Sequence, residues 1–312
     1  MRGGMKMERL NQNDKHTYRI GLISVLSCNT LWGFLPIYWQ ALKPIDSTVI
    51  IFYRVVLMFL VCFAACAVQS GVKGLFKPMF ESKKKTFIYV AAGFVITLNW
   101  SLYIWAVNAG FVIQTCMGYF LEPLVVCCFG IIFYKEKANK WKKISMVFAF
   151  CGLMVMIIGY REIPFIALGL GLSFAIYSAI KKSVFLNPIH SLLYETLFLA
   201  PIALIVIAFI EKSGNGALET AGGFKFFLLM FAGLATAIPM GLFSFAANKL
   251  PLITLGLCEY IAPSITLILG IFLFKEPFDV IQFSAFVVIW IGLVFFTYGE
   301  FADMKNTEIR NT

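Results

Sequence analysis

The stretch GYFLEPLVVCCFGIIFYKEKANKW at residues 118–141 decides the fold, because a related stretch, CEYIAPSITLILGIFLFKEPFDVI, follows at residues 258–281. The two align without gaps at an offset of 140 residues, and the same offset pairs further positions along the chain. The paired positions are Pro123 with Pro263, Gly130 with Gly270, Lys135-Glu136 with Lys275-Glu276, Gly93 with Gly233, Asn108 with Asn248 and Gly152 with Gly292. Solenoid repeats have periods of about 20–50 residues, so this longer period indicates a half-protein that is used twice.

The composition shows which medium this chain is built for. Of its 312 residues, 60% are hydrophobic and only 13% are charged, with a mean hydropathy of +0.85. Soluble domains carry about 25% charged residues. Apolar runs of about 20 residues, each long enough to cross a bilayer, alternate with short polar segments. The predicted spans are Ile20–Ala41, Ser47–Gln69, Phe87–Val107, Val112–Phe133, Ile144–Gly159, Phe165–Ile180, Ser191–Ile210, Phe226–Ala247, Leu252–Phe274 and Val280–Thr297.

We therefore predict an all-α integral membrane protein whose ten transmembrane helices form two inverted five-helix repeats around a central cavity. Residues 20–160 form the first repeat and residues 164–300 the second. Five spans are an odd number, so the second repeat starts from the opposite side of the membrane and lies upside down relative to the first. Residues 1–19, which we expect to be mobile, and residues 301–312 are predicted to be cytoplasmic tails.

The positive charges give the orientation. If the N-terminus is cytoplasmic, 20 of the 26 Lys and Arg residues lie in cytoplasmic segments, five lie on the opposite side and Arg54 lies within a span. This is the bias of the positive-inside rule, and it places both termini in the cytoplasm. The net charge of +10 thus orients the protein in a lipid bilayer, and we expect no nucleic-acid partner. The oligomeric state stays open.

The eight cysteines all lie within predicted spans, with no CxxC spacing and no neighbouring histidine. Such residues are typical small packing groups of apolar cores. We expect no disulfide, no metal and no cofactor.

Prolines interrupt several predicted spans. Each proline removes the bond to the carbonyl four residues earlier and bends its helix, so that Pro123 frees the carbonyl of Tyr119 and Pro263 frees that of Glu259. Interrupted helices at matched positions of two repeats point to the central site of a transporter. The predicted kink positions are Pro36, Pro123, Pro239 and Pro263.

Three ionisable residues within the spans are candidates for the site, because intramembrane charges are functional more often than not. Glu122 lies near the midplane, and is either a proton or cation site or a static partner of Arg54. Arg54 itself is either structural glue or a substrate anchor. Glu259 lies nearer the cytoplasmic mouth. Glu195 lies 141 residues after Arg54, close to its repeat position, and a structural pairing is the favoured role for it.

Aromatic residues near these charges could stack on an aromatic or cationic ligand, although core packing is the alternative for each. The candidates are Trp32, Trp100, Tyr103, Tyr119 and Tyr260. Trp39 is expected instead in the belt of aromatic residues at the membrane interface. Gly93 and Gly233 begin matched rows of small residues that allow close helix packing. Glu136 and Glu276 follow two predicted spans, where we expect caps and headgroup contacts.

Five segments resemble the EamA-domain branch of the drug/metabolite transporter superfamily, in particular the RarD (chloramphenicol-sensitivity) proteins. They are LWGFLPIYW at 31–39, LNWSLYIWAVN at 98–108, GYFLEPL at 118–124, LPLITLGLCEYIAP at 250–263 and FKEPF at 274–278. The resemblance implies ten helices, cytoplasmic termini in a bacterial cytoplasmic membrane, and export of small metabolites or drugs. The family commonly has Asn where Glu122 stands, Gln where Glu259 stands and Gly where Lys275 stands. The two acids are therefore expected to alter cation preference or proton coupling.

Other function classes lack their signatures in this sequence. A hydrolase motif of the GxSxG or HExxH type does not occur, and neither does a phosphate loop. We therefore expect no enzyme but a secondary transporter, an exporter that works by alternating access and is coupled to protons. Amino acid-like metabolites and lipophilic cations are the two substrate classes left open. The alternative is a non-transporting membrane scaffold or assembly protein.

Overall fold

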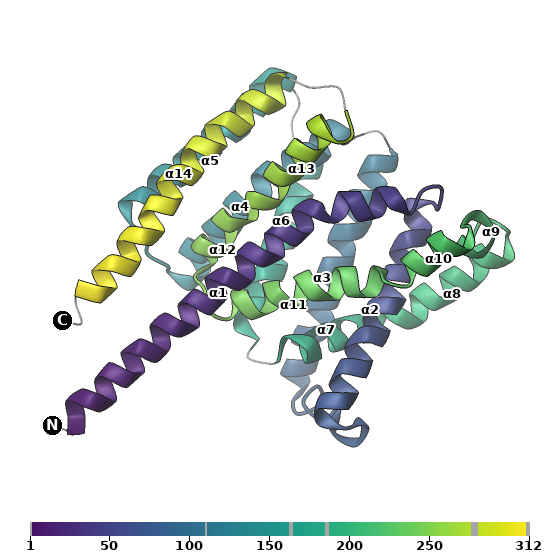
Figure 1. Ribbon diagram of the computed structural model, residues 1–312, viewed down its shortest axis with the longest axis horizontal. Helices are drawn as coiled ribbons and strands as arrows, with labels where there is room; N and C mark the ends of the chain where they lie inside the picture. The colour runs from purple at the N-terminus through teal and green to yellow at the C-terminus, as the bar shows by residue number, and fades with distance from the viewer. Residues whose placement is uncertain (1, 110, 162–164, 185–186, 276–279, 310–312) are drawn as a thin grey trace.

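The computed structural model describes residues 2–109, 111–161, 165–184, 187–275 and 280–309, and within these ranges the regular structure is helical (Figure 1). The first half of the chain contains α1 (Arg2–Ala41), α2 (Ser47–Ser70), the 3₁₀ turn η1 (Val72–Gly74), α3 (Lys83–Asn108), α4 (Val112–Tyr134) and α5 (Lys140–Tyr160). The second half contains α6 (Phe165–Ser183), α7 (Pro188–Leu197), α8 (Leu199–Lys212), α9 (Ala217–Thr220), α10 (Gly223–Leu229), α11 (Ala232–Ala247), α12 (Leu252–Glu259), α13 (Ile261–Phe272) and α14 (Val280–Ile309).

The helices confirm the predicted all-α membrane fold. Among the described residues, nine spans are long and apolar enough to cross a bilayer, and a tenth is added when α7 and α8 are counted as one span bent by 52°. The predicted seventh span, Ser191–Ile210, covers this bent pair. The sequence therefore located all ten apolar segments, but it did not show the bend.

Among the described residues, breaks within spans occur only in the second half. Its spans divide at Phe198 between α7 and α8, at Met230 and Phe231 between α10 and α11, and at Tyr260 between α12 and α13. In the first half, α4 continues through Pro123 and α1 through Pro36. Proline thus has different effects at the two matched positions, because only the span with Pro263 divides.

Pro263 contributes to the break before α13, although a proline alone does not end α4 at Pro123. Pro263 has no N–H with which to bond the carbonyl of Glu259, and α12 ends at that residue. Pro239 lies inside α11 without interrupting it.

Most of the segment expected to be a cytoplasmic tail, residues 1–19, is helical. Residues 2–19 are helical and continue into the span of α1. Arg, Met and Lys, which are good helix formers, recur among these residues. The chain therefore extends an existing helix, which avoids the cost of nucleating a new one.

The pairing of the helices is symmetric between the halves. In order, α1 to α5 correspond to α6, α7 with α8, α10 with α11, α12 with α13, and α14. Across the halves α3 packs on α6 and α7, and α11 packs correspondingly on α1 and α2. The pairs α4 with α12, α2 with α7 and α8, and α5 with α14 connect matched spans directly. Exchanging the halves therefore converts this set of contacts into itself.

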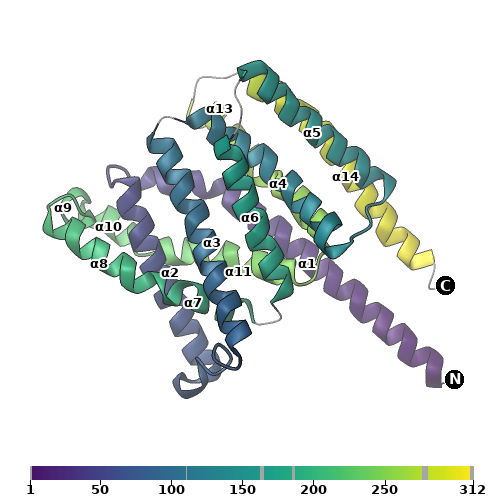
Figure 2. The same ribbon diagram turned by 180° about the vertical axis from the view of Figure 1, so that it is seen from behind.

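Figures 1 and 2 show α5 and α14 side by side along one edge of the bundle, as expected of peripheral helices. The start of α1 and the end of α14 lie at one end of the molecule. We call this end the terminal end.

The glycines predicted to allow close packing do so at matched places. A Cβ atom on Gly93 would clash with the carbonyl oxygen of Glu195 in α7, and one on Gly233 would lie 2.5 Å from the carbonyl oxygen of Leu57 in α2. These distances are shorter than any real contact, so each glycine lets two helices approach at their backbones. The predicted packing role is confirmed.

Candidate functional site

A cavity of about 720 Å³ lies between the two halves. Its walls come from α1, α2, α3 and α4 of the first half and from α6, α11, α12, α13 and α14 of the second. Small-molecule sites usually measure about 300–1,000 Å³. The space is therefore suited to a metabolite-sized ligand.

The cavity occupies the part of the bundle that lies away from the terminal end. In α1 its lining begins at Asn29 and ends at Trp39, which is the C-terminal part of that helix. In α14 it includes only Gln282 and Phe286, near the start of the helix. Because α1 begins and α14 ends at the terminal end, the cavity lies in the opposite half of the molecule (Figure 1).

The structure brings most of the predicted site residues together. Seven of the eight side chains line the cavity, namely Arg54, Glu122, Glu259, Trp32, Trp100, Tyr103 and Tyr119. Tyr260 does not line it. Its hydroxyl donates to the carbonyl oxygen of Phe120 at 2.8 Å, and the side chain is 1% exposed, so Tyr260 is a packing residue that connects the junction of α12 and α13 to α4. Of the predicted kink positions, Pro36, Pro123 and Pro263 line the cavity and Pro239 does not.

Arg54 lies between two tryptophans. Its Cζ atom is 4.4 Å from the ring centroid of Trp100 and 5.7 Å from that of Trp39. Within the described part of the chain no carboxylate pairs with Arg54, and its Nε has no hydrogen-bond partner. The static pair with Glu122 is therefore not formed. Trp39, expected in the interfacial belt, lines the cavity instead.

Glu259 is the most isolated charge of the cavity. It is 4% exposed, and neither of its carboxylate oxygens has a hydrogen-bond partner among the described residues. It ends α12, where the partial negative charge of the helix C-terminus disfavours an anion. Glu122 of α4 is half-buried and lines the same cavity. A carboxylate in such surroundings must bind a proton, a cation or a ligand.

Glu195 has the structural role that its position suggested. Its carboxylate forms a buried ion pair with Lys181 and accepts hydrogen bonds from Ser191 at 2.7 Å and from Tyr177 at 3.0 Å. The charge is thus fully partnered outside the cavity. The cavity lining does not include it.

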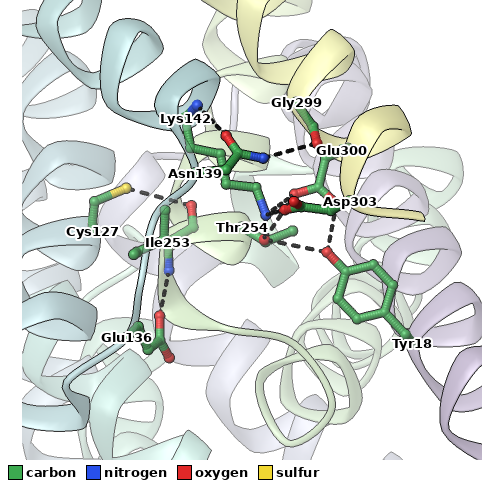
Figure 3. A network of polar contacts seen from close by, with 10 residues as sticks. All are labelled: Tyr18, Cys127, Glu136, Asn139, Lys142, Ile253, Thr254, Gly299, Glu300 and Asp303. Atoms are coloured by element: carbon green, nitrogen blue, oxygen red, sulfur yellow. Dashed lines mark hydrogen bonds and ion pairs between the residues drawn. The ribbon is translucent and has the colours of Figure 1, made fainter. Parts of the chain in front are cut away.

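A second group of polar residues lies at the terminal end (Figure 3). Lys142 Nζ lies 2.6 Å from Glu300 Oε1 and 3.1 Å from Asp303 Oδ2. Thr254 donates to Glu300 at 2.9 Å, and Tyr18 donates to Glu300 at 2.5 Å. We call these five residues the Lys142 cluster. It connects α1 and α5 of the first half to α12 and α14 of the second.

Beside this cluster, Glu136 holds the start of α12. Its carboxylate accepts hydrogen bonds from the backbone N–H groups of Leu252 at 2.8 Å and Ile253 at 3.0 Å, and Lys182 lies 3.1 Å from it. An acid at a helix N-terminus is favoured by the helix dipole. Glu136 was expected to cap its own span and contact headgroups, but it caps a helix of the other half. Glu276, its repeat counterpart, lies outside the described residues.

The lining also contains polar residues that the sequence did not single out. They are Asn29, Ser47, Asn99, Thr115, Thr236, Thr266 and Gln282. A signal existed in α1, where Asn29, Trp32, Pro36 and Trp39 recur at intervals of three or four residues and so share one helix face. Asn99 has a structural part, because its side-chain amide donates to Leu170 and Ser173.

Comparisons with known proteins agree with this architecture. The sequence profile of the EamA-like transporter family matches residues 19–158 and again residues 163–298. The chain is 34% identical to the uncharacterized transporter YojE of Bacillus subtilis, across 90% of this chain and 94% of the relative. It is 32% identical to protein RarD of Streptomyces exfoliatus, across 94% and 92% of the two chains, and 29% identical to protein RarD of Escherichia coli, across 94% and 99%.

The fold has a counterpart among solved structures. One crystal structure superposes with a TM-score of 0.65 and covers 88% of this chain and 96% of its own, at 13% identity, which is a likeness of fold alone. The two profile matches and the identity to RarD and YojE go further. This chain belongs to the EamA-like transporter family and is a multi-pass, RarD-like membrane transporter of the drug/metabolite transporter superfamily.

Proposed function

We propose that the protein is a secondary transporter that exports small metabolites or drugs across the bacterial cytoplasmic membrane by alternating access, driven by protons. One observation carries the proposal: both halves build one cavity, and among the described residues no side chain pairs with its charges Arg54, Glu122 and Glu259. A structural bundle would gain nothing from an unpartnered Glu259, because a buried charge without a partner destabilises the fold.

The symmetry of the helix contacts supports alternating access. If the halves of residues 20–160 and 164–300 are inverted repeats, exchanging their conformations turns a protein open on one side into one open on the other. The set of helix pairs that join the two halves maps onto itself when the halves are exchanged, as this requires. The backbone contacts at Gly93 and Gly233 are likewise exchanged when the halves are exchanged.

The distribution of charge supports an assignment of the two ends. With both termini in the cytoplasm, as the positive-inside rule favours, the cavity lies in the outer half of the membrane, and we propose that it opens to the outside. The Lys142 cluster then lies at the cytoplasmic end and closes it by joining the two halves. For solute to enter from the cytoplasm, contacts such as that of Lys142 with Glu300 must break while the outer part of the cavity closes.

The two acids give the proposal its proton site. Glu122 and Glu259 line the cavity without an ion pair among the described residues, and a carboxylate in low dielectric takes up a proton readily. Proton entry from the outside would reach them through the open cavity. Their protonation on one side and release on the other would couple an inward proton flux to outward solute transport.

The proposal is tested in proteoliposomes that contain a pH indicator and are offered amino acids or lipophilic cations across a pH gradient. We expect one class to move protons with the wild type and not with Glu122→Gln or Glu259→Gln. Glu219→Gln is the matched control, because Glu219 is an exposed acid in α9 outside the cavity. Solute flux that is independent of the pH gradient would refute proton coupling. Absence of any flux would favour the scaffold alternative.

A further inference from the structure

We infer that Arg54 and Trp100 form a binding subsite for a carboxylate, so that the transported solutes are organic acids or zwitterions with an apolar body. The inference rests on the proposed function, since it specifies the ligand of the same cavity. We call the two residues the Arg54 subsite.

The orientation of the guanidinium leaves its hydrogen-bond donors free for a ligand. Arg54 lies over the face of the Trp100 ring, with its Cζ 4.4 Å from the ring centroid. In such a contact the flat face of the guanidinium packs on the ring. Its N–H groups lie in the guanidinium plane and stay available for hydrogen bonds. The Nε atom is buried without a hydrogen-bond partner. A planar fork of this kind matches the two oxygens of a carboxylate.

The chain partners its buried lysines, Lys181 and Lys142, with carboxylates, which argues against a purely structural Arg54. Lys181 is 1% exposed and is bonded to Glu195 and Ser191. For Arg54 the chain supplies two aromatic faces and, among the described residues, no carboxylate. Glu122 lines the same cavity but forms no ion pair with Arg54. An anion from outside the chain would complete this site.

The surroundings indicate the remainder of the ligand. Trp39 lies beside Arg54, and the wall of the same cavity includes Leu35 and Ile50, so it offers an aromatic and aliphatic surface. A carboxylate on Arg54 would thus carry an apolar body along this wall. An ammonium group, where the solute has one, would find Glu122 or Glu259 in the same cavity.

The test compares two probes of equal shape, 4-methylpentanoate and 4-methylpentanamide, which differ only in the anionic group. Binding to the purified protein is measured by tryptophan fluorescence, because Trp100 lies in the subsite. We expect the acid to bind the wild type about tenfold more tightly than the amide, or better, since charge-assisted bidentate bonds are the strong ones. Arg54→Gln should abolish this preference, and Arg54→Lys should retain part of it, because lysine keeps the charge and loses the fork.

Arg161→Gln is the matched control, since Arg161 is exposed at the end of α5 and outside the cavity. It should keep the wild-type preference. The comparison of the two probes on the wild type needs no variant, so it stays decisive if Arg54→Gln fails to fold. Equal affinity for acid and amide, or no saturable binding of either, overturns the inference.

The result is distinguishable from failure of the proposed function. A wild type that moves solute in proteoliposomes but binds acid and amide equally would refute the Arg54 subsite alone. A wild type that prefers the acid but moves no solute would retain the subsite and refute the transporter proposal.

Discussion

Replacing Lys142 with alanine should open the terminal end of the bundle. Lys142 is 7% exposed and Glu300 is 6% exposed, so the substitution removes one partner of a buried ion pair. Such a loss costs about 3–5 kcal/mol. Glu300 keeps its hydrogen bonds from Thr254 and Tyr18, which favours the lower figure. If the Lys142 cluster forms only in the state closed at this end, the substitution destabilises that state by about 3 kcal/mol. The ratio of open to closed protein then rises roughly a hundredfold.

Cys127 provides the reporter for this opening. It is fully buried beside the cluster, with its Sγ atom 3.5 Å from the carbonyl oxygen of Ile253. In a variant whose other cysteines are replaced, the rate of maleimide labelling follows the population of the open state. We expect Lys142→Ala to raise this rate by up to about a hundredfold.

An exposed ion pair outside the Lys142 cluster gives the control. Lys85 pairs with Glu81 at the start of α3, and the two side chains are 52% and 55% exposed. Surface pairs contribute about 0–1 kcal/mol, so Lys85→Ala should leave the labelling of Cys127 unchanged. The reasoning is refuted if Lys142→Ala folds with a normal melting temperature and labels at the wild-type rate.

Further substitutions test the packing and the walls of the cavity. Gly93→Ala should lower the stability by about 1–3 kcal/mol in thermal melts, because it forces two helix backbones apart, whereas Gly222→Ala, with open space around it, should stay within about 0.5 kcal/mol. Glu136→Ala removes the side-chain cap of α12 and should cost about 1–2 kcal/mol, and an unchanged melting temperature would contradict that role. Tyr260→Phe should cost about 1 kcal/mol through the bond to Phe120 and leave ligand affinity unchanged, because Tyr260 does not line the cavity; a weaker affinity would place it in the site.

The sequence predicted the spans because each is a continuous apolar run, which a bilayer requires. It predicted the helix contacts at Gly93 and Gly233 because small residues recur there at the repeat offset. The convergence of Arg54, Glu122 and Glu259 on one cavity followed from the same reasoning about charges at membrane depth. These are local or periodic signals, which can be recognised in the sequence without knowledge of the tertiary structure.

The remaining features depend on contacts between distant residues. The Lys142 cluster joins residues from Tyr18 to Asp303, and its charges lie at span ends, where lysines and acids are ordinary headgroup contacts. The placement of Arg54 between Trp39 and Trp100 requires three different helices. Neither arrangement leaves a spacing that the sequence alone would reveal.

The most direct test of alternating access is the reactivity of one cysteine in the cavity from each side of the membrane. Ala262 lines the cavity and is half-buried, so Ala262→Cys in a background without other cysteines gives this reporter. An impermeant thiol reagent should reach it from the outer face in the wild type. Adding Lys142→Ala should raise the reactivity from the cytoplasmic face and lower that from the outer face. Reactivity from one face only, unchanged by Lys142→Ala, would contradict alternating access.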